Sequence, residues 1–148
     1  MKWISKHWND LSKEELYDFT VLRIGIFVVE QDCPYPEFDG KDQRSTHLWC
    51  LDSQDAVVAY LRIVEPGVSY EEVSIGRVAV HERYRGSGIG RELMEQGMAE
   101  VERLFGKVPI RLSAQEYLRS FYKSLGYIPV GEGYLEDGIP HVEMLYTP

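Results

Sequence analysis

The residues best suited to chemistry form a glycine-rich segment, Arg85-Gly86-Ser87-Gly88-Ile89-Gly90. A run rich in β-branched residues, 73–80, precedes this segment, and apolar residues at helical spacing follow it as far as Phe105. Glycines at a strand-to-helix turn let backbone N–H groups converge on one point without side chains in the way. The start of a helix adds the positive end of its dipole. The segment therefore predicts a binding site for a phosphate group.

The spacing of the glycines excludes two common phosphate motifs. The dinucleotide pattern G-x-G-x-x-G fails because its last glycine would fall on Arg91. The P-loop pattern fails because no Gly-Lys-Ser/Thr follows. The pattern that fits is [Gln/Arg]-x-x-Gly-x-[Gly/Ala], which is met by Arg85, Gly88 and Gly90.

A second segment of interest is Phe121-Tyr122-Lys123-Ser124-Leu125-Gly126-Tyr127, which follows a short predicted strand at 111–115. Gly126 is typical of the residue that ends a helix. The phenol of Tyr122 is able to act as a general acid. Leu118, Tyr122 and Leu125 also share one helix face, which is typical of a buried core stripe. Both interpretations of Tyr122 remain open at this point.

The elements that position these segments alternate in a way that predicts an α/β fold with a mixed sheet and helices on both faces. Ser12 to Glu15 matches a capping box at the start of a helix. We expect that helix to carry along one face Leu16, Phe19, Thr20, Arg23, Ile24 and Phe27, and to break or bend before Glu30. The expected elements in chain order are an edge strand 3–8, this first helix, an irregular loop 31–46, a hairpin 47–51 and 57–64, a strand ending at Val80, a helix 88–105, a strand near Ile110, a helix 115–125, a strand from Tyr127 and a strand 141–146.

Length and composition predict one domain, 1–148, with its own core, since 44% of the 148 residues are hydrophobic. The formal net charge of −8 argues against nucleic acid and against an anionic membrane surface as partners. No stretch approaches the ~20 apolar residues of a membrane span. The start of the chain lacks a signal-peptide core, so we expect a cytoplasmic protein. The two cysteines and four histidines show no metal-binding spacing, so we predict no metal.

The two motifs, in this order, resemble the two diagnostic segments of the GNAT N-acetyltransferase superfamily. Three further segments, 26–35, 39–42 and 136–141, look like the ElaA-like branch of that superfamily, and the likeness runs from about Leu16 to Met144. The resemblance implies the GNAT acyl-CoA N-acyltransferase fold, a mostly antiparallel sheet in which the strand ending at Val80 splays from the one near Ile110. It also implies transfer of an acetyl group from acetyl-CoA to a primary amine in a direct ternary complex, without metal.

The resemblance also assigns roles to residues. The glycine-rich loop is expected to hold the pyrophosphate of coenzyme A, and the strand before it to pair through its main chain with the pantetheine arm. Gln115 is expected either to bind the pantetheine or adenine-ribose arm or to cap a helix. The expected cofactor-binding residues are Val78, Ala79, Val80, Arg85, Gly86, Ser87, Gly88, Ile89, Gly90, Arg91 and Gln115.

Tyr122 is the expected acid that protonates the departing thiolate. Glu30, which ends the first helical region, is the first candidate for the general base, and His141, which enters the last strand, is the second. Either residue is equally consistent with a surface or capping role. His81 and Glu82, directly after the pantetheine strand, are further candidates.

The acceptor is expected to be a small amine, with a cationic amine as one option, because carboxylates are mixed with aromatic side chains among the residues expected around the cleft. An acidic loop kept soluble by its charges is an equal alternative. An acyl-CoA sensor without turnover and a protein N-terminal or lysine acetyltransferase are alternative functions. Homodimers are common in the superfamily, so a homodimer is possible. The expected acceptor-site residues are 27–30, Tyr35, Asp39, Asp42, Tyr134 and 137–140.

Overall fold

The computed structural model describes residues 1–148 and is built on one seven-stranded sheet in the order β1-β2-β3-β4-β5-β7-β6. The strands are β1 (Lys2–His7), β2 (Ser45–Leu51), β3 (Val57–Val64), β4 (Val73–Val80), β5 (Ile110–Gln115), β6 (Tyr127–Glu136) and β7 (Ile139–Tyr146). The helices are α1 (Lys13–Ile24), α2 (Ile89–Phe105) and α3 (Arg119–Ser124). A π-helical turn, Gly25–Glu30, continues α1.

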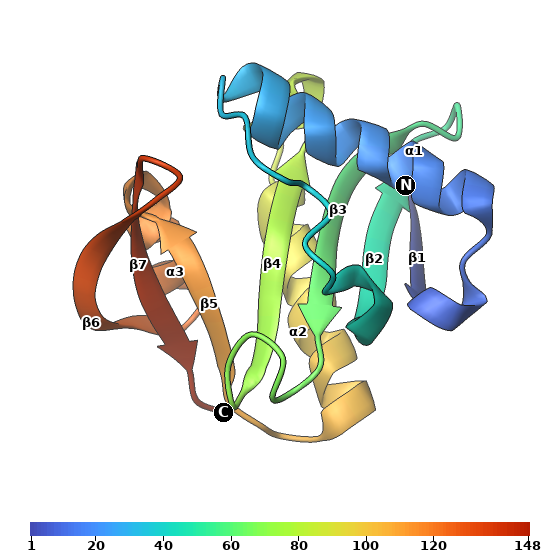
Figure 1. Ribbon diagram of the computed structural model, residues 1–148. Helices are drawn as coiled ribbons and strands as arrows, with labels where there is room; N and C mark the ends of the chain where they lie inside the picture. Colours follow the sequence, from blue (N-terminus) through green and yellow to red (C-terminus); the bar gives the residue numbers. More distant parts are fainter.

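The sheet separates into two arms in its middle. β4 and β5 are parallel and pair only at their first residues, Val73 opposite Ile110 and Ser74 opposite Arg111, whereas the other neighbours are antiparallel. Beyond Ser74 the two strands diverge, and Figure 1 shows the resulting V, which opens toward the end of β4. The expected α/β fold with splayed central strands is confirmed. One edge of β4 is thereby left without a strand partner.

The helices cover both faces of the sheet, α1 on one face and α2 and α3 on the other (Figure 1). α2 lies close to β3 because it has a glycine at the contact. A Cβ atom at Gly97 would lie only 2.7 Å from Cδ2 of Leu61. The main core is formed between α2, α3 and the sheet.

A second, smaller core lies under α1 and contains Phe19, Leu22 and Ile26. These residues follow the spacing i, i+3 and i+7, which defines one face of a helix. The expectation for Ile24 was wrong: it lies off this face and is 37% exposed. Arg23 is on the face, as expected, and is completely buried.

The beginning of α1 has the expected capping box. The backbone N–H of Glu15 donates to Oγ of Ser12 (3.0 Å), and the backbone N–H of Ser12 donates to Oε1 of Glu15 (2.9 Å). The expected helix 115–125 is shorter in the structure, because residues Glu116–Leu118 form a 3₁₀ turn before α3. Over one turn the two helix types have similar periodicity, so the sequence pattern does not separate them. None of the helices is both long and apolar enough to span a membrane.

Candidate active site

A cleft with a volume of about 850 Å³ lies where β4 and β5 diverge. Its lining comes from the diverging strands, the glycine-rich loop, α3, the segment 31–41 and the turn between β6 and β7. The lining brings together the three expected catalytic residues, Tyr122, Glu30 and His141. It also includes Arg85 and Gln115.

The glycine-rich loop has the backbone conformation that its sequence predicts. Gly86 and Gly88 have φ values of +80° and +89°, a region that strains any residue with a side chain. No atom lies within 4 Å of a Cβ built at either position, so the space around the loop is open. Gly88 begins α2 without a side-chain capping bond, which leaves the first N–H groups of the helix for another acceptor. Gly86 and Gly90 line the cleft, whereas Ile89 is buried in the core.

Arg85 is held between the end of β4 and the turn after α1. Its Nε donates to the carbonyl oxygen of Val80 (3.0 Å). Its Nη1 and Nη2 lie 3.0 and 3.1 Å from the carboxylate oxygens of Glu30. The candidate base Glu30 is therefore ion-paired with the arginine that is expected to hold phosphate.

Arg91 and Gln115 lie in different surroundings. Arg91 does not line the cleft: it donates to Oγ of Ser124 (3.0 Å) and to its carbonyl oxygen (3.3 Å), and so ties α2 to α3 beside a separate groove of about 410 Å³. Gln115 lines the cleft at the end of β5, and its side chain makes no capping hydrogen bond. The capping alternative for Gln115 was therefore wrong.

The last three residues of β4 lie beyond a bulge. The register against β3 shifts between Tyr60 and Arg62, and opposite this point Arg77 has a φ of +51°. After the bulge, Val78 and Val80 pack against the main core, whereas Ala79 packs under α1. Side chains alternate across the sheet, so the main chain of this segment presents its edge to the cleft.

Tyr122 serves both as a core residue and as part of the cleft lining. It is 5% exposed and packs edge-to-face on Phe121 and Tyr127. No hydrogen bond to its hydroxyl contributes to the pKa of the phenol, and the residue lines the cleft. Burial raises the pKa of the phenol, with a smaller contribution from Tyr117, so the proton stays on the oxygen at neutral pH.

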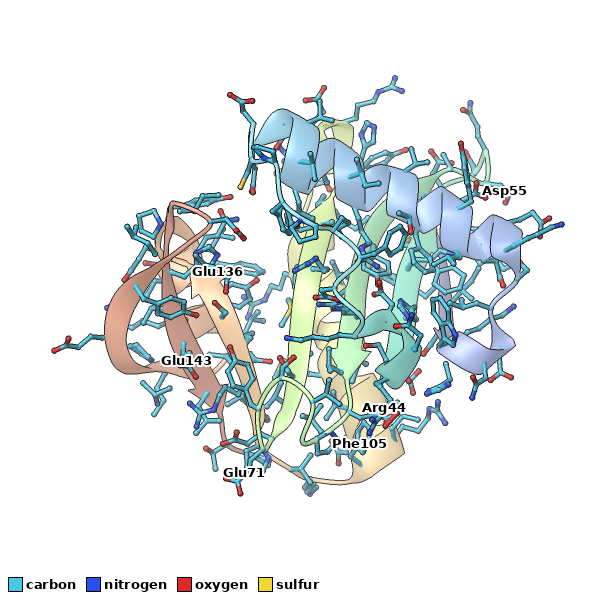
Figure 2. The ribbon with its side chains drawn as sticks, in the orientation of Figure 1. Arg44, Asp55, Glu71, Phe105, Glu136 and Glu143 are labelled. Atoms are coloured by element: carbon cyan, nitrogen blue, oxygen red, sulfur yellow. The ribbon has the colours of Figure 1, made fainter.

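His141 lies on β7, in the same arm of the sheet as Tyr122. Its Nδ1 is 2.7 Å from the carbonyl oxygen of Ile139. A carbonyl only accepts, so Nδ1 carries a proton and donates it; in the neutral ring the lone pair is then on Nε2. Nε2 lies 3.4 Å from the carboxylate of Glu136, and the ring stacks on Tyr134. Figure 2 shows Glu136 and Glu143 on this arm of the sheet.

A buried arginine on α1 begins a network that sequence reasoning did not find. Arg23 Nε donates to Oε1 of Glu37 (2.6 Å), and its Nη1 donates to Oδ1 of Asp42 (2.9 Å). Nη1 also lies 3.3 Å from the hydroxyl of Tyr60. An arginine inside an apolar helix stripe is the one signal in the sequence that indicates partners, because a buried charge is stable only when it is paired.

Two further arginines extend the network to the cleft. Arg62 binds both oxygens of Asp39 (2.5 and 2.9 Å) and one oxygen of Asp42 (3.1 Å). Arg77 Nε donates to Glu37 (3.1 Å), and its Nη2 lies 3.4 Å from Asp39. We call this set the arginine network; its members are Arg23, Arg62, Arg77, Glu37, Asp39 and Asp42.

The arginine network changes which of the expected carboxylates are able to form the acceptor site. Burial favours the neutral form of Asp39, but hydrogen bonds and charge from Arg62 outweigh it and hold the pKa of that carboxyl below its usual range. Asp42 is buried and does not line the cleft, so its expected place in the acceptor site was wrong. Both carboxylates already have arginine partners within the protein.

His47 lies under α1 beside the arginine network, and its ring is neutral. Its Nε2 donates to the carbonyl of Asp42 (3.0 Å), and the hydroxyl of Tyr60 donates to its Nδ1 (2.7 Å). Burial lowers the pKa of His47 to about 4. No group of three or more His, Cys, Asp and Glu side chains is arranged to hold a metal ion, and the absence of a metal stays a prediction.

The chain matches known proteins over almost its whole length. The family model described as "Acetyltransferase (GNAT) domain" matches residues 12–148. The chain is 41% identical to Protein ElaA of Escherichia coli over 145 residues, which cover 97% of this chain and 95% of that protein. The crystal structure of an acyl-CoA N-acyltransferase from Pseudomonas aeruginosa superposes with a TM-score of 0.93 at 41% identity, over 99% of this chain and 100% of the other.

A more distant structure shares the fold alone. An aminoglycoside 6′-N-acetyltransferase complexed with coenzyme A superposes with a TM-score of 0.71 at 16% identity, over 97% of this chain and 96% of that chain. The family match, the ElaA relative and the splayed sheet agree with one another. The chain therefore belongs to the GNAT family of acyl-CoA N-acyltransferases, in the branch that contains ElaA.

Proposed function

We propose that this protein, as one domain spanning residues 1–148, transfers an acetyl group from acetyl-CoA to the primary amine of a small molecule in a direct ternary complex. The observation that carries the proposal is the position of Tyr122: a buried, protonated and unpartnered phenol lines the same cleft as the glycine-rich loop and the unpaired edge of β4. An acid is needed there because the thiolate of coenzyme A leaves as the amide forms.

The residues around the cleft fit acetyl-CoA as a substrate. The open loop at Gly86 and Gly88, together with the uncapped start of α2, offers backbone N–H groups to the pyrophosphate. The free edge of β4 offers main-chain groups to the pantetheine arm, as an added strand would use them. Arg85 adds positive charge once its pairing with Glu30 is exchanged for the phosphate.

The general base is proposed to be His141. Its neutral tautomer places a lone pair on Nε2, and the ring is 6% exposed in the lining of the cleft. An amine that loses its proton to Nε2 attacks the thioester carbonyl, and Tyr122 protonates the departing sulfur. Glu30 remains the alternative base, but its carboxylate oxygens are already engaged by Arg85.

The test is the release of thiol from acetyl-CoA across a panel of amines, for the wild type, Tyr122→Phe and Tyr127→Phe. Tyr127 is the matched control, because its hydroxyl is also buried and has no hydrogen-bond partner. We expect amine-dependent release that falls about a hundredfold or more in Tyr122→Phe, with unchanged affinity for coenzyme A, and that is retained in Tyr127→Phe.

Two results would contradict the proposal. Tight binding of acetyl-CoA without release on any small amine would favour the acyl-CoA sensor, or a protein N-terminal or lysine acceptor. The absence of acetyl-CoA binding would refute the assignment of the glycine-rich loop itself.

A further inference from the structure

We propose that the acceptor is a zwitterion, an amine that also carries a carboxylate, and that Arg77 is the residue that selects for the carboxylate. The inference rests on the proposed function and deepens it, because it names the chemical class of the amine. Its evidence lies in the two walls of the cleft, which carry opposite charge.

Two of the three nitrogens of the Arg77 guanidinium are held by hydrogen bonds. Nε and Nη2 are bound to Glu37 and Asp39 of the segment that crosses the sheet, and the group lies 5.3 Å from the ring centre of Tyr35. Nη1 takes part in none of the hydrogen bonds of Arg77, and Arg77 lines the cleft. A guanidinium whose other donors are already engaged presents its free donor in a defined direction.

The backbone of Arg77 is held in a conformation that a non-glycine residue rarely adopts. Its φ of +51° occurs within a β-strand, at the bulge opposite Tyr60 and Arg62. Such a conformation costs of the order of 1–3 kcal/mol, and it persists where the surroundings impose it, often at a binding site. Because of the bulge, the side chain of Arg77 lines the cleft and departs from the regular alternation of side chains between the two faces of β4.

The wall that contains Arg77 has an excess of positive charge. The arginine network pairs three arginines with three carboxylates, so its charges cancel. Lys41 also lines this part of the cleft, forms no ion pair and adds a positive charge. His47 is neutral because burial lowers its pKa to about 4. This wall is therefore cationic within a chain whose formal net charge is −8.

The opposite wall, on the β6–β7 arm, has the reverse character. Glu136 and Asp137 line the cleft there, and neither is paired with a lysine or arginine. His141, on the same arm, has its lone pair on Nε2. A carboxylate is therefore favoured at Arg77 and Lys41, and an amine is favoured at His141 and Glu136. One small molecule with both groups satisfies both walls.

The test measures kcat and KM for amino acids beside their carboxamides, which are equal in size but lack the negative charge. A series of increasing length runs from glycine through β-alanine and 4-aminobutyrate to 6-aminohexanoate, and several larger L-amino acids are added. This series also shows which distance between the amine and the carboxylate suits the cleft. We expect kcat/KM to be at least about tenfold higher for the carboxylates, mainly through KM, because charge-assisted hydrogen bonds exceed neutral ones.

The variant Arg77→Asn removes the charge, and asparagine tolerates the left-handed backbone. We expect it to reduce the carboxylate-to-carboxamide ratio, measured within the variant, to about threefold or less. Lys41→Gln, on the same wall, should lower the ratio by about two- to fivefold. Arg103→Asn, an exposed arginine on α2 away from the cleft, is the matched control and should keep the ratio.

Equal kcat/KM for carboxylates and carboxamides in the wild type, or a ratio that survives in Arg77→Asn, overturns this inference alone. In that case amines are still acetylated and the proposed function stands. If no member of the panel is acetylated although acetyl-CoA binds, the proposed function fails, and this inference fails with it.

Discussion

At the scale of single residues, the cleft keeps two titratable groups in opposite roles. Tyr122 stays protonated because burial disfavours its anion. In the neutral ring of His141, the Ile139 carbonyl holds the proton on Nδ1, which leaves the lone pair on Nε2. As proposed, Tyr122 on α3 and His141 on β7 line one cleft and supply the acid and the base that amide formation from a thioester requires, because one proton is removed from the amine and another is delivered to sulfur.

The role of His141 gives the first prediction at this scale. His141→Gln removes the base and should lower kcat about a hundredfold at neutral pH, with unchanged affinity for coenzyme A. The remaining rate should rise with pH, because alkali supplies more neutral amine. Steady-state kinetics and coenzyme A titration make the measurement, and Glu143→Gln, on the same strand but outside the cleft lining, is the control that should keep kcat within about fivefold. An unchanged kcat in His141→Gln would exclude this base.

The Glu30–Arg85 pair gives a second prediction. Glu30→Gln frees Arg85 and removes a negative charge beside the expected phosphate site, so coenzyme A should bind about two- to fivefold more tightly. Glu82→Gln changes an unpaired acid close to the same loop and should have a smaller effect. Calorimetric titration with coenzyme A separates the two. A loss of kcat in Glu30→Gln, with unchanged binding, would instead identify Glu30 as the base.

At the scale of elements, the cleft depends on which elements lie beside the two edges of β4. β3 pairs with one edge of β4, whereas the other edge is free beyond Ser74. α2 supports β4 from behind, and it packs closely on β3 because Gly97 has no side chain. The glycine-rich loop is fixed at the start of the same helix, so the position of α2 also decides where the loop lies.

The close contact at Gly97 leads to a stability prediction. Gly97→Val places atoms where Leu61 Cδ2 lies 2.7 Å from a Cβ, and the overpacking should reduce the free energy of unfolding by about 1–3 kcal/mol. Gly25→Ala is the matched control, because Gly25 has a φ of −57° and no atom within 4 Å of a Cβ. It should raise the free energy of unfolding by about 0.5 kcal/mol. Urea unfolding measures both variants; equal stability of Gly97→Val and wild type would show that α2 shifts freely.

At the scale of the whole molecule, the arginine network joins segments that are distant in sequence. It ties α1, the crossing segment 37–42, β3 and β4 into one charge-balanced group beneath the cleft. Buried ion pairs contribute little net stability when compared with apolar packing, but removal of one partner is costly. The network therefore defines the geometry of the acceptor side more than it adds to overall stability.

The neutral His47 in this group predicts how stability depends on pH. Burial lowers the pKa of His47 to about 4, whereas an unfolded histidine titrates near 6.5, so the unfolded state binds more protons between these values. The free energy of unfolding should consequently fall as pH decreases from 6.5 to 4, by up to about 1.4 kcal/mol per pH unit. Denaturation at several pH values measures this slope. His47→Gln should flatten it, and an unchanged slope in the variant would assign the effect to other groups.

The features that depend on local spacing could be predicted from the residues alone. These features are the glycine-rich loop, the capping box at Ser12, the order of strands along the chain and the segment around Tyr122. Each of them depends on a backbone conformation or a periodicity within a few residues. The resemblance to the GNAT superfamily supplied the splay of β4 from β5, which periodicity does not encode.

Tertiary structure alone decided the contacts between distant residues. The pairing of Arg85 with Glu30 joins residues 55 positions apart. The partners of Arg23, the bulge at Arg77 and the tautomer of His141 likewise come from packing and strand register. The physical reason is that a charge or proton is placed by the groups that surround it in space, and sequence spacing fixes those groups only within a turn of helix or a single strand.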